Sequence, residues 1–184
     1  MNGKALAGFA LVLALALAGL ARADVTGQAA LPGLSAQAGA QAGRGPVTNL
    51  PLPRFVSLKT SEGNARRGPS LSHRIDWVFR HYELPLLVTA EYGNWRRVED
   101  RDGAGGWVHY SLLSGVRTVV VVAEVADLRI RAGRDGAVAA RAEAGAIARL
   151  GECLTDWCRI SADGARGWVE KSALWGVGPD EIRD

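Results

Sequence analysis

The chain has 184 residues, of which 22 are lysine or arginine, 19 are aspartate or glutamate and two are cysteine. Its formal net charge of +3 falls to about +1 if an N-terminal leader with two of the basic residues is removed. Binding to nucleic acid depends on a basic surface that contacts phosphates, so the composition argues against a nucleic-acid partner.

The first 23 residues have the pattern of a signal peptide. Lys4 supplies a positive charge, residues 5–20 form an apolar stretch, and Ala21-Arg22-Ala23 is typical of a cleavage site. An uncleaved membrane anchor is the alternative, but the apolar stretch is short for a span of about 20 residues. We therefore expect cleavage after Ala23, a periplasmic or secreted protein, and no stable membrane anchor after cleavage.

Residues 24–53 are rich in Gly, Ala, Gln and Pro and show no sustained hydrophobic period. Such a segment buries too little apolar surface to offset its ordering entropy. We predict a disordered linker, which leaves residues 54–184 for folded structure.

Two copies of one unit follow the predicted linker. The stretch GWVHYSLLSG at 106–115 recurs as GWVEKSALWG at 167–176, and NWRRV at 94–98 corresponds to DWCRI at 156–160. Further upstream, ARRG at 65–68 corresponds to IRAG at 130–133. Small loop insertions explain the drifting offset, so the pattern predicts a tandem repeat with copies at 54–116 and 117–179 and a short tail at 180–184.

Each copy is predicted to be all-β. Short apolar or alternating runs, such as 55–58, 86–88 and 95–98, are separated by turn signals such as Glu62-Gly63-Asn64. The alanine-rich residues 137–146 resemble a helix in composition, but their place in the repeat favours strand and turn. About five short strands in about 60 residues, without a long helix, predict a small barrel for each copy.

This series of motifs resembles the bacterial SH3-like domain. The residues that carry the resemblance are NARRGPS at 64–70, GNWRRV at 93–98 and the two GWV motifs. Over residues 55–177 the chain is similar to tandem SH3-like proteins exported by alphaproteobacteria. The resemblance implies two small barrels that bind cell-wall or protein ligands without catalytic residues. The second copy has Arg129 in place of asparagine and Gly133-Arg134 in place of Gly-Pro, which points away from ligand binding by that copy.

The two cysteines are predicted to form a disulfide, because paired cysteines in an exported protein are normally oxidised. On one extended strand, Cys153 and Cys158 would lie roughly 16 Å apart, too far to bond. Across a hairpin loop of residues 154–157 they would face each other at about 4.5–5.5 Å. The repeat places a turn there, since Tyr92-Gly93-Asn94 is the counterpart in the first copy.

Other chemistry finds less support in the sequence. A zinc site would need four ligands, a redox pair favours C-x-x-C, and a cysteine nucleophile needs a neighbouring histidine on a larger scaffold. Asp100 and Asp102 lie in a glycine-rich segment typical of a solvated hairpin loop. We therefore predict no metal, no cofactor and no catalytic residue, and a protein that is not an enzyme.

Five of the six tryptophans fall into two groups. Trp95, Trp107, Trp157 and Trp168 occupy equivalent positions in the two copies, and we expect them in the barrel cores. Trp77, Arg80 and Tyr82 form an aromatic and basic cluster that only the first copy has. This cluster either forms a ligand-binding groove, or Trp77 fills the interface between the barrels.

The sequence thus predicts an exported, non-enzymatic binding or scaffolding module, with peptidoglycan or a periplasmic protein as its ligand. The alternative is an accessory subunit of a cell-envelope enzyme carried on a separate chain.

Overall fold

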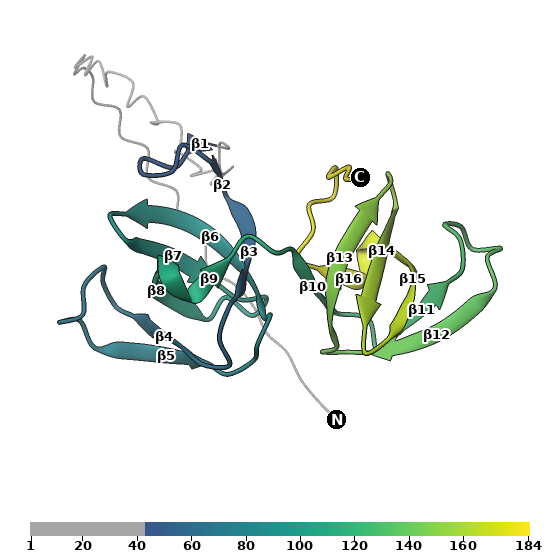
Figure 1. Cartoon of the computed structure of the whole chain (residues 1–184), viewed down its shortest axis with the longest axis horizontal. Coiled ribbons are helices and arrows are strands. Elements are labelled where there is room, and N and C mark those ends of the chain that lie inside the picture. Colours follow the sequence, from purple (N-terminus) through teal and green to yellow (C-terminus); the bar gives the residue numbers. More distant parts are fainter. Residues whose placement is uncertain (1–42) are drawn as a thin grey trace, which may run out of the picture. The chain divides into compact units, whose positions relative to one another are not determined.

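The computed structural model describes residues 43–184; the predicted signal peptide and most of the predicted linker lie outside the described residues. A two-stranded hairpin is followed by two seven-stranded antiparallel sheets, each curled into a small barrel (Figure 1). The described part contains only two short 3₁₀ turns besides its strands. The prediction of an all-β fold with two tandem barrels is confirmed.

The first barrel has the strand order β5-β4-β8-β7-β6-β3-β9. Its 3₁₀ turn, Tyr110–Leu112, connects the last two strands. The strands are β3 Arg54–Leu58, β4 Gly63–Arg66, β5 Ile75–Phe79, β6 Pro85–Tyr92, β7 Trp95–Glu99, β8 Gly105–His109 and β9 Leu113–Ser114.

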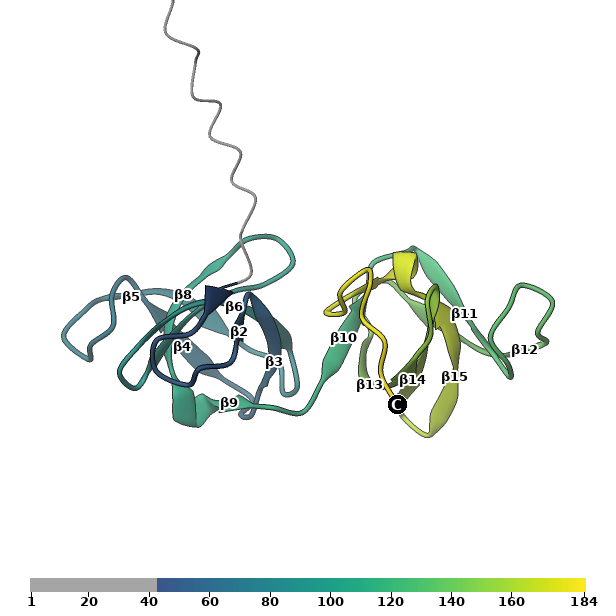
Figure 2. The same ribbon diagram turned by 90° about the horizontal axis from the view of Figure 1, so that it is seen from above.

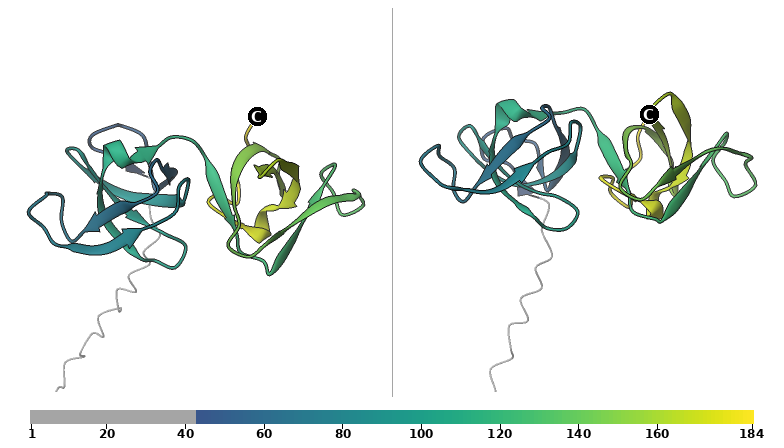
Figure 3. Two further views of the ribbon diagram at one scale, coloured as in Figure 1. Left: turned by 60° about the horizontal axis from the view of Figure 1, so that its bottom comes forward. Right: turned by 90° about the horizontal axis from the view of Figure 1, so that it is seen from below.

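The second barrel repeats this order as β12-β11-β15-β14-β13-β10-β16, with a 3₁₀ turn at Lys171–Ala173. In each barrel the second and third strands form a hairpin that extends from the rest of the sheet (Figures 2 and 3). The strands are β10 Thr118–Val121, β11 Val125–Arg129, β12 Val138–Glu143, β13 Ile147–Cys153, β14 Trp157–Ala162, β15 Ala165–Glu170 and β16 Leu174–Trp175.

Strand pairing corrects the alignment of the two copies in this extended hairpin. Arg66 pairs with Trp107, and Arg129 pairs with Trp168, so Arg129 corresponds to Arg66 and not to Asn64. The sequence placed the copies two residues out of register here because ARRG and IRAG share an arginine and a glycine at the same spacing, although the strand pairing differs. Arg129 is therefore no departure from the first copy: both arginines donate to backbone carbonyls of the adjoining loop.

The two cores fill equivalent positions with different side chains. Gly63 pairs with Phe79 in the first barrel, and Ala126 pairs with Ala142 in the second. Phe79 is the largest fully buried side chain of the first core, and its place in the second core is taken by an alanine. Leu128 compensates for the volume that Phe79 occupies in the first core. It is buried at the position where the first core has Ala65.

The repeated tryptophans lie outside the cores, contrary to the prediction. Val98 and Val108 are fully buried, and successive strand residues point to opposite faces, so Trp95 and Trp107 face outward. Both hydrophobic core clusters consist of aliphatic residues, Phe79 and the cysteines, without a tryptophan. The sequence shows the alternation of each strand, but it does not show which of two apolar faces the barrel encloses.

The N-terminal hairpin, β1 Gly43–Arg44 and β2 Pro51–Leu52, lies within the segment predicted to be disordered. Its turn is held by the Glu91 carboxylate, which accepts hydrogen bonds from the backbone of Val47 (3.1 Å) and Thr48 (2.9 Å) and from the Thr48 hydroxyl (2.6 Å). Composition could not predict that this segment is ordered. Glu91, which anchors it, lies about 40 positions further along the chain.

The Cys153–Cys158 disulfide is present, with the two Cα atoms 4.1 Å apart, and the two cysteines are paired across β13 and β14. At the same place in the first barrel, Glu91 is paired with Arg96 across β6 and β7. A covalent bond in one copy and a buried ion pair in the other thus fix the end of the same hairpin.

Replacing both cysteines by serine is expected to lower the free energy of unfolding by about 2 kcal/mol and to leave the fold intact, because the bond closes a short loop. Urea denaturation of the double variant measures the loss. Complete unfolding of the second barrel in the absence of denaturant would contradict the expectation.

Candidate functional site

The three residues predicted to bind ligand lie at the end of the β4–β5 hairpin and in the loop that follows it. Trp77 is on β5 and is 46% exposed, and Arg80 and Tyr82 are exposed in the connection to β6. Among the described contacts, none joins two of these three side chains. Their joint role in binding therefore stays a prediction.

The alternative role for Trp77, at the interface between the copies, can be compared with the contacts that join them. The Glu83 carbonyl accepts a hydrogen bond from Thr118, and its carboxylate forms an ion pair with Arg149. The Phe55 ring packs edge-on against Trp175, with the ring centroids 5.2 Å apart. These contacts use Phe55 and Glu83 of the first copy and do not involve Trp77.

A row of partly to largely exposed aromatic side chains crosses three neighbouring strands of the first barrel. Tyr92 on β6 pairs with Trp95 on β7, which in turn pairs with His109 on β8. The rings of Trp95 and His109 meet edge-on, with their centroids 5.5 Å apart. The centroids of the His109 and Tyr110 rings are 4.9 Å apart. Tyr92 and Tyr110, at the two ends, are 65% and 51% exposed. We call these four residues the aromatic row.

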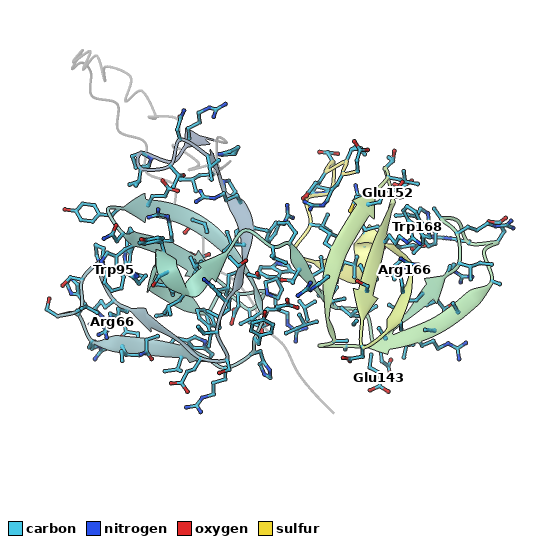
Figure 4. The ribbon with its side chains drawn as sticks, viewed as in Figure 1. Arg66, Trp95, Glu143, Glu152, Arg166 and Trp168 are labelled. Carbon is cyan, nitrogen blue, oxygen red and sulfur yellow. A yellow bond between two sulfur atoms is a disulfide. The ribbon has the colours of Figure 1, made fainter. Side chains whose placement is uncertain are left out.

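A tight turn places Tyr92 and Trp95 on the same face of the β6–β7 hairpin. Gly93 has a φ of +49°, a left-handed conformation that favours glycine, and it turns the chain so that Tyr92 and Trp95 lie opposite each other. Arg96 points to the other face of β7, where it meets Glu91. Figure 4 shows Trp95 and Arg66 on the same flank of the first barrel.

The second barrel keeps only the tryptophan of this row. Trp157 pairs with Glu170 where the first barrel pairs Trp95 with His109. The next residue is Lys171, which is buried, in place of the exposed Tyr110. Two hollows of about 610 and 450 Å³ adjoin Trp157. Their charged walls include Glu170, which forms an ion pair with Arg134 at 2.8 Å.

The chemistry available in the first barrel is therefore recognition by stacking. Aromatic faces and edges pack against sugar rings, proline rings and other apolar groups. Within the described residues, no cluster of His, Cys, Asp and Glu could hold a metal ion, and no helix is long and apolar enough to cross a membrane. The sequence did not predict Tyr92, His109 and Tyr110 as site residues, because the alternation with Val98 and Val108 separates the two faces without showing which face is outside.

The fold defines a pair of tandem small all-β barrels. The bacterial SH3 domain family matches the chain twice, at residues 59–115 and 122–176. These matches cover more than half of the chain, so the protein belongs to the bacterial SH3 domain family, with two tandem copies. Domains of this family are binding modules that are often extracellular or periplasmic. The narrower resemblance to exported alphaproteobacterial proteins stays a prediction.

Two solved structures from Trichomonas vaginalis are similar to the chain. One is NlpC2, with 15% identity and a TM-score of 0.32 over 67% of this chain and 48% of that protein. The other is NlpC1, with 16% identity and a TM-score of 0.31 over 66% of this chain and 45% of that protein. The chain thus spans about half the length of either protein. Comparison with curated protein sequences gives no match.

Proposed function

We propose that the protein is an exported, non-enzymatic binding module whose first barrel recognises peptidoglycan or a periplasmic protein through the aromatic row. The observation that carries the proposal is the outward-facing aromatic row, in which the rings of Trp95, His109 and Tyr110 are in contact and Tyr92 is paired with Trp95. The second barrel supports the assignment to the first, because it has Glu170 and the buried Lys171 in place of His109 and Tyr110.

Trp95→Ala is expected to weaken binding to purified cell-wall sacculi at least tenfold, since loss of a stacking anchor costs about 1–3 kcal/mol. Trp157→Ala is the matched control, because it removes the equivalent tryptophan from the second barrel. Co-sedimentation of the protein with sacculi measures both. Equal binding by the two variants would refute the aromatic row as the site. If the wild-type protein stays in the supernatant but co-purifies with an envelope enzyme, the accessory-subunit alternative is favoured.

Trp77→Ala in the same assay tests the cluster predicted from the sequence. A site at Trp77, Arg80 and Tyr82 would lose at least tenfold in affinity with an unchanged melting temperature. A lower melting temperature with unchanged binding would give Trp77 a structural role.

Export is supported by the leader sequence and by the Cys153–Cys158 disulfide. We expect the protein recovered from the periplasm or the medium to begin at Asp24, and its intact mass measures this. A mass that includes residues 1–23, found in the membrane fraction, would indicate an uncleaved anchor.

A further inference from the structure

The first barrel also has a hollow that is built differently from the aromatic row. It has a volume of about 350 Å³ and lies between the N-terminal hairpin, β3 and the 3₁₀ turn. Val56, Val88 and Leu113 supply apolar walls, Tyr110 stands at its edge, and Arg54 and Arg96 also line it. The hollow therefore combines apolar surface with two guanidinium groups.

These two arginines share a single buried carboxylate. Nη2 of Arg54 lies 2.7 Å from Glu91, and Nε of Arg96 lies 3.6 Å from the same oxygen. The arginine side chains are 17% and 9% exposed, whereas Glu91 is fully buried. Two positive charges against one negative charge leave the hollow with an excess positive charge.

Arg96 has donor capacity left over. Its Nη1 donates to the carbonyls of Gly93 (2.9 Å) and Trp95 (2.8 Å). Within the described part of the chain, no hydrogen-bond acceptor lies against its Nη2. A ligand carboxylate in the hollow would meet both the excess charge and a free donor.

The second barrel has an occupant at the equivalent place, its own C-terminal segment. Arg117 corresponds to Arg54 in the strand pairing, and it binds both carboxylate oxygens of Glu181, at 2.7 and 3.0 Å. Lys171, which corresponds to Tyr110, donates to the carbonyls of Pro179 (3.1 Å) and Glu181 (2.7 Å).

The same C-terminal segment also pairs with the sheet. The backbone of Arg183 exchanges two hydrogen bonds with Cys153, the residue that corresponds to Glu91. In the first barrel the N-terminal hairpin bonds to Glu91 but leaves the hollow beside Arg96 and Tyr110 open. One barrel thus holds an acidic peptide segment where the other keeps an open hollow.

We propose that the hollow of the first barrel binds an acidic, extended peptide segment of a partner protein, in the manner in which the second barrel holds residues 178–183. The partner's carboxylate faces Arg54 and Arg96, and its apolar side chains contact Leu50, Tyr110 and Leu113. This proposal rests on the binding function proposed above, but its surface shares only Tyr110 with the aromatic row, and its partner is a protein.

The probe for the test is a labelled peptide with the sequence of residues 177–184, VGPDEIRD, and a second peptide in which glutamine replaces its glutamate. We expect saturable binding of the first peptide to the protein by fluorescence anisotropy, and at least tenfold weaker binding of the second. Leu50→Glu, at the exposed rim of the hollow, is expected to weaken binding to the same extent by charge repulsion. Leu154→Glu, an exposed leucine of the second barrel, is the matched control and is expected to bind as the wild type does.

Amide chemical shifts locate the site without any substitution. Shifts at Arg54, Arg96 and Leu113 on peptide addition support the proposal. Shifts confined to Arg117 and Lys171, or equal affinities for the two peptides, would overturn it. Because sacculus binding by the Trp95→Ala variant is measured separately, failure of this proposal and failure of the proposed function can be told apart.

Discussion

Replacing Glu91 by glutamine is expected to lower the free energy of unfolding by about 3–5 kcal/mol, because Arg54 and Arg96 would stay largely buried without their shared carboxylate. The turn of the N-terminal hairpin would also lose a charged acceptor for the Val47 and Thr48 amides. Urea denaturation, followed by tryptophan fluorescence, measures the loss.

Glu99→Gln is the matched control, since Glu99 lies on the same β6–β7 hairpin but is partly exposed and 3.9 Å from Arg97. A weak ion pair of this kind contributes less than about 1 kcal/mol. Equal stability of the two variants would contradict a stabilising role for the buried network.

The stability difference between the wild type and Glu91→Gln is expected to fall as the pH is lowered. Burial raises the pKa of Glu91, but hydrogen bonds from Thr48, Arg54 and Val47 outweigh it and lower the pKa from 4.5 to about 2. A carboxyl group with a lowered pKa stabilises the fold fully above the unfolded pKa and loses this effect as the pH falls toward the folded pKa. The stability difference between the wild type and Glu91→Gln should therefore shrink by up to about 3 kcal/mol between pH 5 and pH 2.

The sequence predicted the all-β fold and the disulfide from local strand and turn patterns, and it predicted the repeat because the same motifs recur in the same order. The alternation of apolar residues marks the strands, and the turn between Cys153 and Cys158 brings the sulfurs together. Order in residues 43–53 depends instead on Glu91, which is distant in sequence. Composition carries no trace of such a contact.

The candidate site was harder to predict because a strand with apolar residues on both faces leaves the direction of the core undecided. In β7, Trp95 and Val98 lie on opposite faces, and volume favours the tryptophan as the core residue. In the first barrel, aliphatic side chains and Phe79 fill the interior, and Trp95 lies outside the core. The second copy does lack the aromatic residues that the first copy has around Trp77. This difference includes Phe79 on the same face of β5, whose counterpart is an alanine.

Phe79→Ala is expected to lower the free energy of unfolding by about 3–5 kcal/mol, because it removes the largest buried side chain of the first core and leaves a cavity. Ala65→Leu by itself is expected to cost about 1–3 kcal/mol, because that core is already filled. Both variants are measured by urea denaturation.

The double variant Ala65→Leu/Phe79→Ala should be more stable than the sum of the two losses implies. It gives the first core the large and small residues that Leu128 and Ala142 provide in the second. We expect a favourable coupling of about 1–3 kcal/mol, within the range for residues that share one cavity. Gly63 is left unchanged, because a Cβ there would lie 2.7 Å from Cδ1 of Leu58. If the two losses add strictly, the side chains at these two positions do not compensate for each other's volume. The reciprocal pair Leu128→Ala/Ala142→Phe repeats the test in the second barrel.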